Sequence, residues 1–577
     1  MQKTGTWCVA VLMWMALTAC GGGGGDSAST TTGTTSGSSS VASSSSSTQN
    51  SAQSSTSSTS STGSAQSSSS AGSSVATSST WNISTGANLA DIATASFSTL
   101  SIALDTLTVT SGSSALAVAS TSNGTLVTQA GSTVVTVVAD NYGLTITSTA
   151  PTTTPIALAL SGSYGKTITI YSDNDFRLNL NGVTLASTDG PAINVQSKKR
   201  AFVTVTGSNV LSDTSTWTSR TLADGSAMDL KATFFSEGPL ILEGSGSLGI
   251  TAASKHALCS DAHVRLRAGT VTLKAVKKDG VRANNAFVMD GGDLTITTQA
   301  GKGIKVEGKE DDTTPLGFIA INAGTLNITS YDKAISASWE AEDGDTTTTA
   351  DDPDPRVTIN GGTINVTTTG TPFETSTDSL SPEGIEAKSI LTVNDGVITV
   401  NTTDDGLNAG KHIAINGGRL YVKSSQNDAV DSNGTLTISG GLLVAQGAGA
   451  PEGALDADNN TFTVTGGTFV GIGGRNSTVT TSTSTQNTVS LSNAAAGLLV
   501  IRDASGNVAF AYTLPTSASA VLLSSPSLGT GTRYTVYRGG TLGTYTELFY
   551  GLYLGAGSYT TGTAGSSFTI SSTVTSL

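Results

Sequence analysis

The chain has 577 residues, a formal net charge of −14, and only 12% charged and 5% aromatic side chains. Its negative charge argues against nucleic acid as a partner, because neutralising phosphates requires a basic surface. Its 67 glycines and few large side chains indicate a β-rich chain with many tight corners and a narrow core, since glycine adopts positive φ at little cost.

Residues 1–20 predict a bacterial lipoprotein signal peptide. The apolar stretch 7–17 follows Lys3 and is too short to span a bilayer. It ends in Leu17-Thr-Ala-Cys20, which resembles the lipobox in which the cysteine receives a lipid; an ordinary signal peptide with a chance cysteine is the alternative. Lipidation of Cys20 would anchor the protein without spanning the membrane. Gly21 rather than Asp follows this cysteine, which by resemblance to enterobacterial sorting would not hold the protein at the inner membrane if the host is Gram-negative; we expect the outer membrane or cell surface.

Three further segments differ from one another in composition. Residues 21–80 are almost wholly Gly, Ser, Thr, Ala and Gln, which bury too little apolar surface to offset the entropy of ordering, so we expect a flexible tether. Residues 81–161 are β-rich but lack a Gly-Gly repeat, and they predict an N-terminal β cap for a repeat domain. Residues 475–577 predict a C-terminal β domain.

Residues 162–474 repeat one pattern. Copies read Asp279-Gly-Val-Arg-Ala, Glu383-Gly-Ile-Glu-Ala, Asp405-Gly-Leu-Asn-Ala and Asp428-Ala-Val-Asp-Ser. The uninterrupted period is roughly 22 residues, and each copy holds three short strands of period two separated by Gly-Gly or Asp-Gly corners. One copy cannot bury its own apolar side, so the copies must stack and share a core. The pattern predicts an all-β fold, a parallel β-helix.

Stacking places the outward residues of the repeat in columns, with neighbouring rungs ~4.8 Å apart. In the later rungs these columns hold acidic residues and one amide: Glu383, Glu386, Asp405, Asn408, Asp428, Asp431 and Asp456. Like charges at this spacing repel, and Ca²⁺ would relieve the repulsion because it accepts about 6–8 oxygen ligands in irregular geometry. The alternative is that these are corner residues, since Asp and Asn favour turns.

The earlier rungs carry cations in the same columns: Arg282, Lys302, Lys305 and Lys333. A fixed cationic patch could bind sugar carboxylates through charge-assisted hydrogen bonds. The alternative is a solvated surface whose aliphatic stems pack on the sheet. Trp339 beside this patch is a candidate platform for a sugar ring, although it could equally cover apolar surface beside a long loop.

Together these stretches resemble the carbohydrate-binding right-handed parallel β-helix proteins first recognised in cellulose-degrading clostridia. The matching stretches are 176–196, Phe234-Phe-Ser-Glu-Gly, Lys255-His-Ala-Leu-Cys-Ser-Asp, Lys278-Asp-Gly-Val-Arg-Ala, Glu383-Gly-Ile-Glu-Ala-Lys, Asp404-Asp-Gly-Leu-Asn-Ala, Asp428-Ala-Val-Asp-Ser-Asn-Gly and 524–537. The resemblance implies binding of cellulosic and acidic sugar polymers, bound calcium, and a fold similar to calcium-dependent pectate lyases. Lys302 and Lys333 stand where the family usually has Asp, and Glu383 replaces another Asp. These departures call a cation site in the middle rungs into question and leave the later rungs intact.

Three functional hypotheses follow. The first is a surface-tethered, monomeric, calcium-associated protein that binds acidic or cellulosic polysaccharides. The second is a pectate-type lyase, with Lys302 or Arg282 as the base and a cation on the substrate carboxylate. The third is a structural adhesin in which the solenoid is only a rigid spacer. We favour binding because the sequence offers no acid–base set beyond the column of cations.

Overall fold

The computed structural model confirms an all-β fold. It describes residues 81–93, 95–111, 114–115, 118–121, 124–127, 135–222, 225–309, 317–340 and 354–577. The predicted signal peptide with Cys20 and the predicted tether lie outside these residues. The described helical structure is a single 3₁₀ turn, η1 (Leu89–Asp91).

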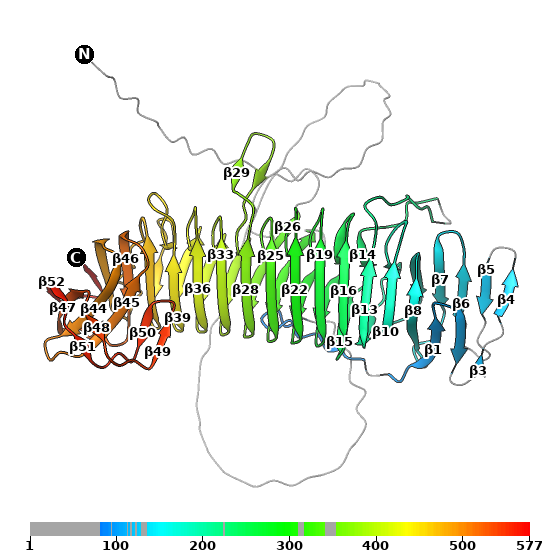
Figure 1. Cartoon of the computed structure of the whole chain (residues 1–577), viewed down its shortest axis with the longest axis horizontal. Helices are drawn as coiled ribbons and strands as arrows, with labels where there is room; N and C mark the ends of the chain where they lie inside the picture. Colours follow the sequence, from blue (N-terminus) through cyan, green and yellow to red (C-terminus); the bar gives the residue numbers. More distant parts are fainter. Residues whose placement is uncertain are drawn as a thin grey trace, which may run out of the picture. The chain divides into compact units, whose positions relative to one another are not determined.

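Each coil of the solenoid contributes three strands, as the sequence predicts. One coil consists of β17 (His256–Ser260), β18 (His263–Leu266) and β19 (Thr270–Ala275). Each strand pairs in parallel with its equivalent in the next coil, for example β17 with β20 (Val281–Ala283). The repeat is therefore a parallel β-helix with three walls, and successive coils follow one another along the sequence (Figure 1).

The first wall is a 13-stranded sheet, and it carries both predicted columns. Its strands in chain order are β6 (Val135–Ala139), β7 (Gly143–Ser148), β9 (Thr167–Ser172), β11 (Ile193–Val195), β14 (Ala232–Ser236), β17, β20, β23 (Ile304–Lys309), β26 (Ile335–Glu340), β31 (Ile385–Ala387), β34 (Leu407–Ala409), β37 (Val430–Ser432) and β40 (Leu455–Asp456). We call this sheet wall one.

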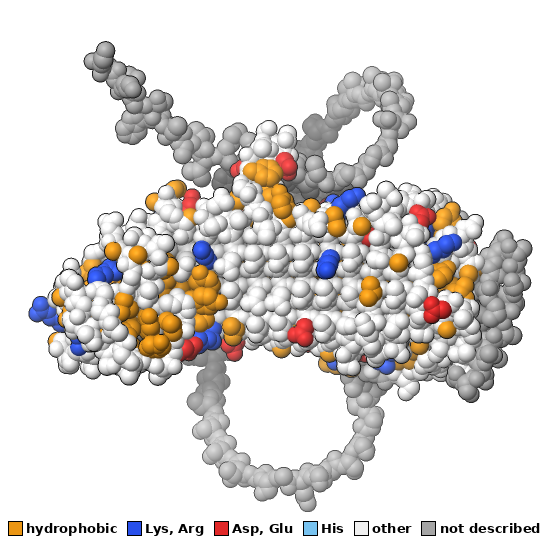
Figure 2. Space-filling model, in the orientation of Figure 1, with side chains coloured by type: hydrophobic (Ala, Val, Ile, Leu, Met, Phe, Trp, Pro, Cys, Tyr) orange, Lys and Arg blue, Asp and Glu red, His pale blue; other side chains and the backbone are white. Residues whose placement is uncertain are grey.

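Walls two and three begin together in the long strands β8 (Ile156–Tyr164) and β10 (Phe176–Ala186). Wall two continues through β12 (Ala201–Thr206), β15 (Leu240–Gly244), β18, β21 (Ala286–Met289), β24 (Phe318–Ile321), β27 (Arg356–Ile359), β32 (Ile390–Val393), β35 (His412–Ile415), β38 (Thr435–Ile438) and β41 (Phe462–Val464). Wall three continues through β13 (Ser208–Ser212), β16 (Ser247–Ala252), β19, β22 (Asp293–Thr298), β25 (Thr325–Ser330), β28 (Thr363–Thr368), β33 (Val397–Thr402), β36 (Arg419–Ser424), β39 (Leu442–Gln446) and β42 (Thr468–Gly473). Figure 2 shows wall three as a mostly uncharged surface.

The core consists of aliphatic side chains stacked in register. On wall one, Ile304 lies opposite Ile335, which lies opposite Ile385, and the stack continues through Leu407 and Val430. All five side chains are fully buried. Because strand residues alternate between two faces, this inward stack requires the flanking residues of each strand to face outward.

The Gly-Gly corners join walls two and three. At one corner Gly418 has φ +83°, and a Cβ on Gly417 would lie 2.2 Å from the backbone oxygen of Asn394. Glycine is therefore required there for both conformation and space. The preceding asparagines form a ladder, in which Asn394 Nδ2 donates to Asn360 Oδ1 at 2.8 Å and Asn416 Nδ2 donates to Asn394 Oδ1 at 3.0 Å.

Residues 81–97, which we call the strap, run along the outside of wall two. The strap begins beside β24, where the Trp81 ring lies 5.2 Å from Phe318, and ends at β1 (Ser98–Ala103), which pairs with β8. Its buried Asp91 lies 3.0 Å from His263 Nε2 and 3.2 Å from Arg265 NH1. Burial alone would raise the pKa of Asp91, but the hydrogen bond and charge of His263, with nearby arginines, lower it overall.

The C-terminal strands cover the last coil. Strand β46 (Ala518–Ser524) pairs antiparallel with β42 and with β43 (Thr488–Ala494). A separate six-stranded sheet contains β44 (Gly497–Asp503), β45 (Val508–Leu514), β47 (Arg533–Arg538), β49 (Glu547–Phe549), β50 (Leu552–Leu554) and β52 (Thr563–Thr569).

The remaining strands are β2 (Thr108–Ser111), β3 (Ser114–Ala115), β4 (Val118–Thr121), β5 (Gly124–Val127), β29 (Phe373–Glu374), β30 (Ser379–Leu380), β48 (Thr541–Leu542), β51 (Tyr559–Thr560) and β53 (Val574–Ser576). Within the described ranges, no helix has the length and apolar character needed to cross a membrane.

Candidate functional site

The predicted site residues lie in two columns on wall one. The first column follows the strand register through Arg282, Lys305, Ser336, Glu386, Asn408, Asp431 and Asp456. The second column contains Asp279, Lys302, Lys333, Glu383, Asp405 and Asp428, whose carbonyl groups accept hydrogen bonds from the backbone of the preceding rung. Residues far apart in the sequence thus become neighbours across rungs, as the repeat predicts.

Three aspartates of the last rungs form a compact cluster. Oxygen atoms of Asp428, Asp431 and Asp456 all lie within 4.8 Å of one another. Asp405 and Asn408 extend this group, because Asn408 Nδ2 donates to Asp405 Oδ2 at 2.9 Å and to Asp431 Oδ2 at 3.1 Å. We call these five residues the aspartate cluster. Its oxygen-rich side chains are the ligand type that hard divalent cations prefer.

The electrostatics of the aspartate cluster are unfavourable to full ionisation. Burial, with the charges of Asp431 and Glu383, raises the pKa of Asp405 to about 9. Burial also raises the pKa of Asp428 to about 7, and burial with the charge of Asp428 raises the pKa of Asp431 to about 7. At neutral pH some of these carboxyl groups therefore remain protonated unless a cation neutralises the cluster.

Arg475 and Ser477 contact the end of the aspartate cluster. Arg475 NH2 forms an ion pair with Asp456, and the Ser477 hydroxyl donates to Asp456 Oδ1. Within the described residues, no comparable ion pair is present at Asp405, Asp428 or Asp431. Sequence reasoning missed Arg475 because it lies beyond the last repeat, where spacing gives no signal.

Glu383 and Glu386 lie one rung earlier and are paired with lysines. Lys333 Nζ lies 2.6 Å from Glu383 Oε1 and 3.4 Å from Glu386 Oε1, and Lys388 Nζ lies 2.7 Å from the latter atom. Despite burial, Lys333 and Lys388 lower the pKa of Glu386, whereas burial and the charge of Glu386 raise that of Glu383. A cation at this rung would have to displace these lysines. Lys388 was also missed, although strand alternation from Glu386 places it outward.

The predicted cationic patch is largely neutralised by neighbouring acids. Arg282 NH2 and Lys305 Nζ both contact Glu307 Oε2, at 2.9 Å and 2.8 Å. Lys302 has no ion pair within the described ranges, and its backbone N–H donates to Asp279 Oδ1 at 2.8 Å. Trp339 lies on β26 opposite Gly308 and is partly exposed. This position is compatible with a platform for a sugar ring and equally with a cover for apolar surface.

A polar groove of about 720 Å³ lies on the earlier rungs of the same wall. Its lining includes the predicted Arg282 together with Lys231, Asp261, Glu237 and His256. Lys231 Nζ lies 2.7 Å from Asp261 Oδ2. Burial, with nearby carboxylate charges, raises the pKa of Glu237. The sequence repeat did not predict this groove, because most of the charged residues that line the groove lie outside the two columns.

Comparisons with known proteins give one family and one similar structure. The family model of carbohydrate-binding domain-containing proteins matches residues 140–429, half of the chain. The chain is also similar to a solved structure of the polysaccharide lyase-like protein from C. thermocellum, a gadolinium derivative. The match has 19% sequence identity and a TM-score of 0.32, and it covers 46% of this chain and 93% of the C. thermocellum chain. No curated protein matches. On the family match, the chain belongs to the carbohydrate-binding domain-containing family.

Proposed function

We propose that the protein is a cell-surface carbohydrate-binding protein that holds acidic polysaccharides along wall one with the help of bound calcium. The family supports a carbohydrate ligand. The acidic class of glycan, the calcium and the attachment through Cys20 are our inferences from the columns and from the sequence of residues 1–20.

The observation that carries this proposal is the aspartate cluster. The carboxylates of Asp428, Asp431 and Asp456 lie at distances that suit shared coordination of one ion, and the raised pKa values of Asp428 and Asp431 indicate a deficit of positive charge. Calcium suits the site better than zinc, because the candidate ligands are oxygens in irregular geometry and no histidine belongs to the group. One further oxygen, Glu383 Oε2, is buried without a hydrogen-bond partner on the adjoining rung.

The remaining charges of wall one support a glycan lying along the coils. A uronate carboxylate could bind a partly coordinated calcium directly, and the groove beside Arg282 could receive neighbouring sugar units. Arginine and lysine in that region would add charge-assisted hydrogen bonds to sugar carboxylates. Such a ligand would compete with Glu307 for Arg282 and Lys305, so each of these contacts should contribute modestly.

Retention on immobilised polygalacturonate, measured with calcium and with a chelator, tests the proposal. We expect retention with calcium, loss with chelator, and loss in the double variant Asp428→Asn, Asp431→Asn. The control is Asp293→Asn, an exposed aspartate on wall three. Failure to bind any acidic glycan would refute the proposal. Indifference of both retention and thermal stability to calcium would favour the structural-adhesin hypothesis, in which the solenoid is only a rigid spacer.

The lyase hypothesis concerns Lys302 and Arg282. Arg282 is engaged by Glu307, so Lys302 is the better placed candidate base among the two. Formation of unsaturated, ultraviolet-absorbing product from polygalacturonate would support a lyase, and its loss in Lys302→Met would assign the base. Binding without product would support the binding function.

A further inference from the structure

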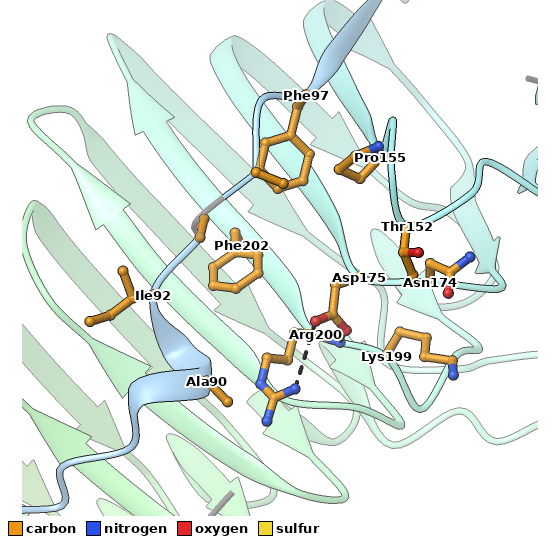
Figure 3. Close-up of a pocket in the computed structure, with 12 residues that line it drawn as sticks. Ala90, Ile92, Phe97, Thr152, Pro155, Asn174, Asp175, Lys199, Arg200 and Phe202 are labelled. Atoms are coloured by element: carbon orange, nitrogen blue, oxygen red, sulfur yellow. Dashed lines mark hydrogen bonds and ion pairs between the residues drawn. The ribbon is translucent and has the colours of Figure 1, made fainter. Parts of the chain in front are cut away.

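A second cavity lies away from wall one, under the strap (Figure 3). Its volume is about 420 Å³, within the usual range for small-ligand sites. One side is formed by strap residues Ala90, Ile92, Ala93, Ala95 and Phe97, and the other by residues in or next to the turns before β8, β10 and β12. The cavity therefore exists only while the strap is docked on the solenoid.

One side of this cavity is apolar and aromatic. Phe97 from the strap and Phe202 from β12 lie with ring centroids 6.4 Å apart, and Ile92 and Pro155 continue the same surface. The Arg177 guanidinium carbon lies 4.7 Å from the Phe97 ring centroid, which fixes that ring against β10. Such a surface suits the C–H face of a sugar ring, which packs on aromatic side chains.

The other side is polar, with Asn174, Asp175, Lys199 and Arg200 along it (Figure 3). Arg200 NH1 lies 3.6 Å from Asp175 Oδ2, and its Nε lies 3.5 Å from Asp91 Oδ1. These are ion-pair distances without direct hydrogen bonds, and the Asp175 side chain is 44% exposed whereas Arg200 is 25% exposed. The guanidinium and the carboxylate of Asp175 therefore keep hydrogen-bonding capacity for a ligand.

We propose that this cavity binds a neutral hexopyranose unit of a glycan, independently of calcium. A pyranose ring presents apolar C–H groups on its faces and hydroxyl groups at its edge, which matches the two sides of the cavity. Two carboxylates, Asp91 and Asp175, balance Arg200 and Lys199, so the site does not select for an anion. The sugar class rests on the carbohydrate-binding family, but the site, its ligand charge and its independence of cations go beyond the function proposed above.

Calorimetric titration of the full-length protein with cellotetraose, in the presence of a chelator, tests the inference. We expect saturable binding that weakens roughly tenfold in Phe97→Ala, because one aromatic contact is lost. Asp175→Asn should weaken binding by a similar factor while its amide oxygen still accepts the Arg200 backbone N–H. Asp293→Asn on wall three is the control.

Two results would overturn the inference: no binding of cellotetraose, or binding by Phe97→Ala and Asp175→Asn that is as tight as that of the wild type. If Phe97→Ala lowers the melting temperature, its weaker binding could result from a loosened strap. The affinity of Asp175→Asn for cellotetraose then decides the test alone. The outcome is separable from that on wall one, because polygalacturonate retention with calcium should be unchanged in both strap-cavity variants. Loss of polygalacturonate binding in Asp428→Asn, Asp431→Asn should conversely leave cellotetraose binding intact.

Discussion

Calcium-free protein should lose stability as the pH rises, because the aspartate cluster holds protons in the folded state. The pKa values of Asp428 and Asp431 are about 7 in the fold, against an ordinary 3.8. The folded state thus binds more protons than the unfolded state between these values. The stability from this source is complete below the unfolded-state pKa and is lost as the pH rises to the folded-state pKa. For Asp405 the same loss continues to about pH 9.

The size of this effect follows from the two pKa values. For Asp428, a change from 3.8 to about 7 corresponds to about 4 kcal/mol of unfolding free energy. Asp431 would add a similar amount if it titrated alone, but the two groups repel each other and titrate together. Between the two pH values of the assay, about pH 5 and pH 8, we therefore expect a loss of roughly 3–5 kcal/mol from Asp428 and Asp431 in the absence of calcium, and Asp405 adds to this loss.

Urea unfolding at about pH 5 and about pH 8, with calcium and with chelator, measures this loss. Calcium should restore stability at the higher pH, because an ion bound only by the folded state stabilises it. Asp431→Asn should flatten the pH dependence in chelator. Carboxyl groups with lowered pKa, such as Glu386 and Asp91, titrate at lower pH and do not mask the effect. Equal stability at both pH values in chelator, unchanged by calcium, would refute the reasoning.

Three further predictions concern the supports of the site. Lys333→Met removes a cation that contacts buried Glu383 and Glu386, so urea unfolding should show destabilisation by roughly 3–5 kcal/mol; a loss near zero would contradict the ion-pair assignment. Asp91→Asn replaces a buried carboxylate that contacts His263 and Arg265 under the strap, so limited proteolysis should cleave the strap faster than in wild type, and unchanged cleavage would count against this anchoring role. Gly406→Ala would place a Cβ 2.4 Å from the backbone oxygen of Ala429, so the melting temperature should fall, whereas an unchanged value would show that the rung can shift.

The repeat predicted the fold and the stacking of the site because both depend on backbone register. Period-two strands between Gly-Gly corners place equivalent residues one above another, so Glu386, Asn408, Asp431 and Asp456 could be assigned to one column from spacing alone. The column continues across the longer connection between β26 and β31, since Ser336 and Glu386 are adjacent although they are 50 residues apart in sequence.

The pairing of charges could not be predicted in the same way. Whether Lys333 contacts Glu383 or solvent depends on side-chain rotamers and burial, which the period of the repeat does not fix. Arg475 at Asp456 comes from a segment beyond the repeat. The strap contacts link residues such as Asp91 and His263, which are 172 positions apart and share no pattern. Long-range contacts of this kind leave no local signal in one sequence.

Along wall one the protein itself supplies positive charge at the early and middle rungs but hardly any at the last ones. Lys231 lies beside Asp261, Lys305 beside Glu307, and Lys333 beside Glu383. Beyond that rung, Asn408 occupies the position between Asp405 and Asp431 where a cation would be expected. On the function proposed above, external calcium would act where the column lacks a cation of its own.

This difference predicts the behaviour of Asn408→Lys. The new ammonium group would lie between the two aspartates that now share the Asn408 amide, as Lys333 lies between Glu383 and Glu386. We expect higher stability at about pH 8 in chelator than in wild type, by a few kcal/mol, and a much smaller gain on adding calcium. Asn401→Lys, a change of the same type on wall three, is the control. A calcium response as large as that of the wild type would place the ion elsewhere, because an internal lysine and a bound ion cannot both neutralise the same carboxylates.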